Sequence, residues 1–138
     1  MNKTAKNILA LILGIIIGGF INKSLIDISD SVIAIPEGFD NTTIEGIKSS
    51  IHLLEPKHFI FPFLAHGVGT LIGALVAGLI AATHKLKFAL AIGALFLTGG
   101  IMMVVMAGGP MWFIIVDLTL AYIPMAYLGF IISNRFSK

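Results

Sequence analysis

Four long apolar runs, separated by short polar segments, set the pattern of the chain. The runs cover residues 8–22, 59–83, 88–107 and 111–133, and the only aspartate, glutamate, lysine or arginine inside them is Asp117. A helix that crosses the hydrocarbon core of a bilayer needs about 20 mostly apolar residues. The pattern therefore predicts an all-α integral membrane protein whose four transmembrane helices form a compact bundle.

The first run has an alternative interpretation, because a basic start followed by a short apolar stretch is also typical of a secretory signal peptide. Lys3 and Lys6 supply such a start. However, no Ala-x-Ala cleavage motif follows the run, and the next residues are Asn22-Lys23-Ser24. We therefore expect this segment to be retained as the first helix.

Residues 23–57 form the one sizeable polar segment and are predicted to be a loop. Within it, Thr42-x-x-Glu45 fits a capping box, and four apolar residues then recur at helical spacing: Ile44, Ile47, Ile51 and Leu54. Pro56 is expected to end this helix. The segment thus predicts a short amphipathic helix that lies on the membrane surface or over the mouth of the bundle.

The composition agrees with a membrane protein. Hydrophobic residues make up 57% of the 138 residues and charged residues 12%, whereas soluble domains have roughly 45–50% and 25%. We expect a single membrane domain over residues 1–138, with the lipid bilayer as its partner and no cofactor. A formal net charge of +2 gives no reason to expect nucleic acid. The lack of cysteine excludes disulfides and thiolate metal sites.

The positive charges predict the orientation in the membrane. With four spans, both termini and the turn at residues 84–87 lie on one side, which collects Lys3, Lys6, Lys85, Lys87, Arg135 and Lys138. The other side has only Lys23, Lys48 and Lys57. Because cytoplasmic loops carry the excess of lysine and arginine, we expect both termini in the cytoplasm and residues 23–57 outside.

Two ionisable residues lie well inside the apolar runs, His66 and Asp117. The second and fourth spans run in the same direction, and these residues follow the outer ends at Phe59 and Met111 closely. With a rise of 1.5 Å per residue, both lie about 9–11 Å below those ends. An acid in the hydrocarbon costs roughly 2.5–3.5 kcal/mol on insertion scales, so we expect Asp117 to face away from lipid and to contact His66.

Glycine spacing supports an inward-facing His66. Gly69 and Gly73 share its helix face, and small residues at this spacing let another helix approach closely. Gly14 and Gly18 repeat the spacing in the first span. There the general frequency of glycine in membrane helices is an equally good explanation. We assign all four glycines to helix packing.

Two further residues complete the predicted ligand or proton site around His66 and Asp117. Pro124 shares the helix face of Asp117 and is expected to kink the fourth span, because it cannot donate a backbone hydrogen bond. Thr98 on the third span lies about one turn deeper than the pair. A kink beside a buried acid is a place where a cavity can form.

Two weaker patterns point to metals. Glu55 and His58 have the i, i+3 spacing of carboxylate–histidine sites, although Pro56 lies between them, and they would place a metal at the outer mouth. Four methionines near the outer ends of the third and fourth spans would, with His66, suit a cuprous ion: Met102, Met103, Met106 and Met111. Methionine more often fills packing space, so no metal site is assigned.

The site favours a small, homo-oligomeric membrane transport or ligand-binding protein that takes a small cation or solute from the outside. Two other interpretations stay open. The His66–Asp117 pair would act as a packing contact in a structural or assembly subunit of a larger membrane complex. It would act as acid and base in an intramembrane enzyme. The sequence has no phosphate loop or Ser-His-Asp arrangement, which favours a protein that is not an enzyme.

Overall fold

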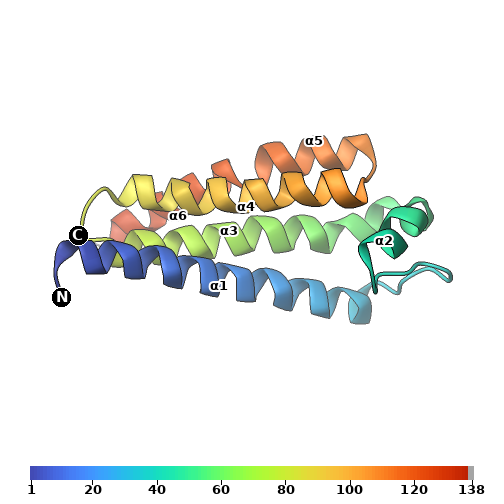
Figure 1. Cartoon of the computed structure of the whole chain (residues 1–138), viewed down its shortest axis with the longest axis horizontal. Helices are drawn as coiled ribbons and strands as arrows, with labels where there is room; N and C mark the ends of the chain where they lie inside the picture. The colour runs from blue at the N-terminus through green and yellow to red at the C-terminus, as the bar shows by residue number, and fades with distance from the viewer. Residues whose placement is uncertain (137–138) are drawn as a thin grey trace.

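A computed structural model describes residues 1–136, and every regular element in that range is helical. Lys138, one of the charges that predict the orientation, lies outside this range. The elements are α1 (Lys3–Val32), α2 (Ile44–Ser50), the 3₁₀ turns η1 (Ile51–Leu53) and η2 (Pro56–Phe59), α3 (Ile60–Ile80), α4 (Lys85–Ala107), α5 (Met111–Leu120) and α6 (Ile123–Phe136). Four stretches are long and apolar enough to cross a membrane: α1, η2 with α3, α4, and α5 with α6. Figure 1 shows these stretches side by side, with both termini at one end and α2 at the other.

Helix α3 is the central element, because it contacts α1, α4 and α6. Both helices contribute glycines to the contact between α3 and α1. A methyl group on Gly18 would lie 2.7 Å from the carbonyl oxygen of Gly69, and one on Gly73 would lie 2.7 Å from that of Gly14. The four glycines therefore bring two backbones together within one chain. They consequently give no reason to expect self-association between copies.

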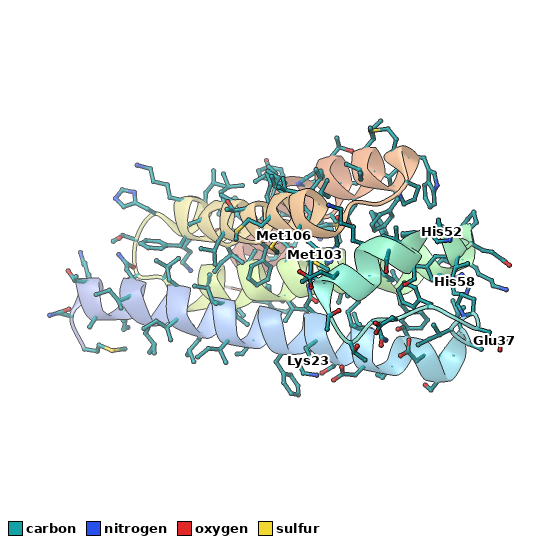
Figure 2. All side chains as sticks on the ribbon, turned by 45° about the vertical axis from the view of Figure 1, so that its right-hand side comes forward. Lys23, Glu37, His52, His58, Met103 and Met106 are labelled. Atoms are coloured by element: carbon teal, nitrogen blue, oxygen red, sulfur yellow. The ribbon has the colours of Figure 1, made fainter. Side chains whose placement is uncertain are left out.

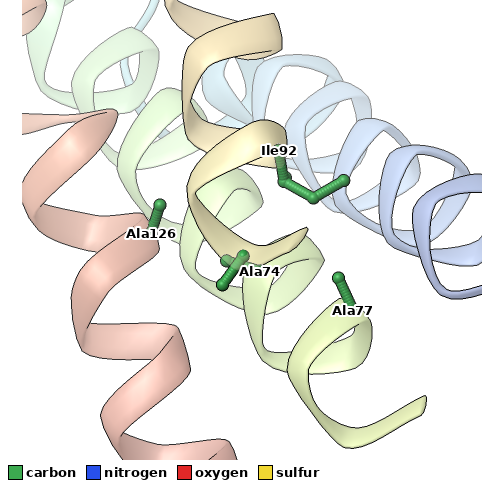
Figure 3. Packing of buried hydrophobic residues seen from close by; sticks show 5 residues of the cluster. Ala74, Ala77, Ile92 and Ala126 are labelled. Atoms are coloured by element: carbon green, nitrogen blue, oxygen red, sulfur yellow. The ribbon is translucent and has the colours of Figure 1, made fainter. Parts of the chain in front are cut away.

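Small residues also line the contacts of α3 with α6 and of α4 with α6. A methyl group on Gly129 would lie 2.6 Å from the carbonyl oxygen of Leu71, and one on Gly93 would lie 2.6 Å from the Cβ of Ala126. The buried core is accordingly built mostly from alanine (Figure 3): Ala74, Ala77, Ala89, Ile92 and Ala126. Such small side chains let the helix backbones approach closely and gain dispersion energy over the whole contact.

The register between α1 and α3 is fixed at the end of the bundle that carries the termini. The side-chain oxygen of Asn7 accepts hydrogen bonds from the backbone nitrogens of Ala82 (2.9 Å) and Thr83 (3.3 Å). Its amide nitrogen donates to the hydroxyl of Thr83 at 2.9 Å. These bonds satisfy backbone groups of the turn after α3, where α-helical bonding has ended.

Helix α1 is longer than the sequence predicted, since it continues ten residues past position 22 to Val32. Its polar residues find partners inside the helix. Lys23 and Asp27 form an i, i+4 ion pair of 2.6 Å, and the hydroxyls of Ser24, Ser29 and Ser31 donate to carbonyl oxygens of the preceding turn. The predicted loop at residues 23–57 is therefore helical at its start. At about 45 Å, α1 exceeds the thickness of a hydrocarbon core.

The short amphipathic helix exists, but its start differs from the prediction by one residue. The hydroxyl of Thr43, rather than that of Thr42, accepts the hydrogen bond from Gly46 N at 2.9 Å. Thr42 instead donates from its backbone and its hydroxyl to the carboxylate of Asp40. Because the two bonds favour the ionised carboxylate, they lower the pKa of Asp40.

Candidate functional site

His66 and Asp117 are hydrogen-bonded to each other. The Nδ1 atom of His66 lies 2.8 Å from Oδ1 and 3.0 Å from Oδ2 of Asp117, whose side chain is only 4% exposed. A second donor, the hydroxyl of Tyr122, lies 3.1 Å from Oδ2. The carboxylate thus receives two hydrogen bonds, which is what a buried acid requires.

A break in the fourth predicted span brings Tyr122 to this position. Helix α5 ends at Leu120 and α6 begins at Ile123, because Pro124 has no N–H with which to bond the carbonyl of Leu120. Tyr122 is 2% exposed, and its ring stacks on that of His66 with centroids 5.6 Å apart and an interplanar angle of 26°. The predicted kink is therefore present, and it changes which side chains face inward.

Tyr122 is the residue of the candidate site that was not predicted from the sequence. In an uninterrupted helix it would point about 140° away from Asp117, five residues earlier, so its inward position required the break. The one signal in the sequence is its place directly before Ile123-Pro124. Pro124 itself is exposed and lines neither cavity at the site, so its predicted inward face is wrong, although its predicted kink is correct.

Helix α4 reaches the site through Gly100 rather than through Thr98, which corrects the prediction for Thr98. A methyl group on Gly100 would overlap the hydroxyl of Tyr122. Thr98 is exposed, and its hydroxyl donates to the carbonyl of Ala94 at 2.9 Å. Helix residues two positions apart point about 200° away from each other, so an inward Gly100 forces Thr98 outward.

The second ring nitrogen of His66 has no partner within residues 1–136. In the same residues, no side-chain nitrogen or oxygen is both buried and without a hydrogen bond, so Nε2 is accessible. When the neutral ring donates Nδ1–H to Asp117, Nε2 carries the lone pair and is an acceptor. The hydroxyl of Thr70 donates to the backbone carbonyl of His66 at 2.7 Å and not to its ring.

His66 lines two cavities. The larger one has a volume of about 400 Å³ and lies between the end of α1, the α2 segment and the start of α3. It is here called the outer cavity because it lies at the end of the bundle that carries α2. The smaller one, here called the lateral groove, has a volume of about 220 Å³ and is lined by Gly19, Asn22, His66, Leu95, Phe96, Gly99, Gly100, Met103 and Tyr122. Met103 also lines both. His66 and Met103 therefore border both cavities.

Glu55 and His58, the weak candidates for a metal site, do not turn their side chains toward a common point. Nδ1 of His58 accepts from Glu55 N at 2.9 Å, and Nε2 donates to the carbonyl of Ala34 at 3.1 Å. The carboxylate of Glu55 pairs with Lys57 at 3.2 Å. His58 therefore ties the backbone at Ala34 to that at Glu55, at the end of the bundle that carries α2 (Figure 2). Residues 1–136 hold no group of three potential metal-binding side chains.

The four methionines do not gather around His66. Met103 lines both cavities, while Met102, Met106 and Met111 line neither and are each at least 44% exposed. Figure 2 places Met103 and Met106 on α4. A cuprous site of His66 with several thioethers is not assembled by this arrangement.

Comparisons with protein-family models, with curated proteins and with solved structures give no match to this chain. Evidence for a function therefore comes from the geometry of His66, Asp117 and Tyr122 and from the two cavities that His66 lines.

Proposed function

We propose that the protein is a small membrane protein that binds a solute from the outer side and takes part in its transport, with His66 as the ligand contact. The observation that supports this most directly is the accessible Nε2 atom of a histidine whose other nitrogen is held by a buried carboxylate. A histidine oriented in this way presents one defined acceptor to whatever occupies the cavity.

The contrast with His58 argues against a purely structural pair. Both ring nitrogens of His58 are used by backbone groups, as expected of a histidine that only holds segments together. His66 uses one nitrogen for packing and turns the other to open volume. The outer cavity, at about 400 Å³, also falls within the roughly 300–1,000 Å³ that is usual for small-molecule sites.

The depth of His66 suits a site reached from the outside. It lies six residues after Ile60 and fourteen before Ile80, the ends of α3, which is about 9 Å and 21 Å at 1.5 Å per residue. The excess of lysine and arginine at the end with the termini supports a cytoplasmic location for that end. The outer cavity would then lie at the external face of the membrane.

This orientation predicts a labelling pattern in intact cells. The chain has no cysteine, so Ser31→Cys and Thr4→Cys each introduce a single reactive thiol at an exposed position near opposite ends of α1. A membrane-impermeant maleimide should label the Ser31 variant before lysis and the Thr4 variant only after lysis. The reverse pattern would show that the outer cavity opens to the cytoplasm.

Ligand binding by His66 can be tested on molecules that co-purify with the protein in lipid nanodiscs. Native mass spectrometry of the wild type should show a bound small molecule that His66→Ala loses. His52→Ala is the matched control, since His52 is exposed and lines neither cavity, and it should keep the molecule. Equal retention by all three proteins, or an empty cavity in a density map of the wild type, would contradict the proposal.

An enzyme is the second candidate, because a histidine held by a carboxylate is also the arrangement of a general base. The hydrogen bond between His66 and Asp117 supports this candidate as well. The two differ in what happens to the bound molecule. A transported or bound solute is recovered unchanged, whereas an enzyme that uses Nε2 as a base converts it, and His66→Ala abolishes the conversion.

A further inference from the structure

The outer cavity and the lateral groove share His66 and Met103. We propose that they bind one molecule together: an amphiphile with a protonated amine as its head and an alkyl chain. The head lies in the outer cavity beside Asp30 and His66, and the chain lies in the groove between α1 and α4. This inference rests on the proposed ligand-binding function of His66 and names the chemical class of its ligand.

The lateral groove opens toward the lipid. Helices α1 and α4 approach closely where a methyl on Gly14 would lie 3.0 Å from Ile92, and one on Gly18 would lie 3.0 Å from Phe96. At Gly19, the next residue of α1, and at Gly99, three residues past Phe96 on α4, a methyl group would meet nothing within 4 Å. The rim of the groove is therefore bare backbone, exposed on both helices. It gives an alkyl chain a path from the bilayer to His66.

The head is predicted from the hydrogen-bonding character of the polar side chains in the outer cavity. The carboxylate of Asp30 and the Nε2 atom of neutral His66 are acceptors. The hydroxyl of Ser29 donates to the carbonyl of Ile26 at 2.7 Å and lies 3.2 Å from the carboxylate of Asp30. Both nitrogens of His58 are engaged, and the amide of Asn41 can accept as well as donate. A head that donates hydrogen bonds fits these groups better than one that accepts them.

The charge of the surrounding segment adds a preference for a cation. Residues 23–57 carry six acids and three lysines, so the potential at the mouth of the cavity favours positive charge. Aromatic rings line the same cavity and can stabilise an ammonium group through cation–π contacts: Phe39, Phe59, Phe61 and Phe113. An amine therefore fits better than an alcohol of equal chain length.

The alkyl chain of the amphiphile locates the ligand but contributes little to the preference for this site over the bilayer. Lipid tails are more apolar than the groove, whose lining includes Asn22, His66 and Tyr122, so moving an alkyl chain from the bilayer into it gains no hydrophobic free energy. The amine head must therefore supply most of the preference for this site over the surrounding lipid. Changes at Asp30 should alter selectivity, while changes at Gly19 and Gly99 should block access.

The test uses the full chain in nanodiscs and dodecylamine that carries a photoreactive diazirine near the end of its chain. Labelling should fall on α1 and α4 residues that line the groove. Gly19→Leu and Gly99→Leu fill the groove and should lower the yield at least about tenfold, which corresponds to about 1.4 kcal/mol of binding free energy. Ala94→Leu adds nearly the same bulk to an exposed position about 140° around α4 from Gly99 and should leave the yield unchanged.

Competition identifies the head. Excess unlabelled dodecylamine should abolish labelling, dodecanol should compete at least about tenfold less well, and Asp30→Asn should remove this difference. Equal competition by dodecanol and dodecylamine, or wild-type labelling yields in the two groove variants, would overturn the proposal. The proposed function fails separately, because a molecule lost from His66→Ala but not from the groove variants would keep His66 as a ligand contact and exclude the amphiphile.

Discussion

Replacing Gly69 or Gly73 by alanine is expected to destabilise the folded protein by about 1–3 kcal/mol, the usual cost of added volume in a filled contact. A Cβ atom at Gly69 would lie 2.9 Å from the carbonyl oxygen of Gly18, and one at Gly73 would lie 2.7 Å from that of Gly14. The obstacle is backbone in both cases, so no rotamer change can relieve it. Helix α1 would have to move away from α3 along the whole contact.

Thermal unfolding in nanodiscs, followed by circular dichroism, measures this effect. Gly19→Ala and Gly99→Ala are the matched controls, since a methyl group at either position meets nothing within 4 Å. They should unfold at the wild-type temperature or slightly above it, because alanine favours a helix over glycine. If the Gly69 and Gly73 variants unfold with the controls, α1 and α3 do not form this close contact in the membrane.

The helical segments were predictable because each has enough apolar residues to span a bilayer. The residues at which the helices begin and end were harder to predict. Polar residues at 23–31 suggested the end of the first span, yet the ion pair between Lys23 and Asp27 and the back-bonded serines satisfy them within α1. A polar stretch ends a helix only when its groups find better partners elsewhere.

The equal depth of His66 and Asp117 was predictable because depth depends only on helix rise. Both lie six residues into α3 and α5, which run in the same direction, and equal counting gives equal depth. The direction in which a side chain points is harder to predict, because it depends on an unbroken 3.6-residue period. The break before Pro124 turns Tyr122 inward and leaves Pro124 outside, so a straight-helix argument misplaced both.

Asp117→Leu is expected to be among the most harmful single substitutions in the chain. It leaves both Nδ1 of His66 and the hydroxyl of Tyr122 without their partner, and each unpaired buried group costs about 1–3 kcal/mol. It also removes the acceptor that holds the proton on Nδ1. Nitrogen NMR of histidine-labelled protein should therefore show neutral His66 protonated on Nδ1 in the wild type and not in this variant.

Asp117→Asn separates the acceptor from the charge and completes this test. The asparagine oxygen can still accept from Nδ1–H, so the histidine signals should stay close to those of the wild type. Its loss of charge should still weaken binding of the co-purifying molecule. His66→Ala should weaken binding at least as much, and the double variant should be no worse than His66→Ala, because the two residues act as one unit. Additive losses in the double variant, or a wild-type His66 protonated on Nε2, would show that Asp117 does not orient the ring toward the cavity.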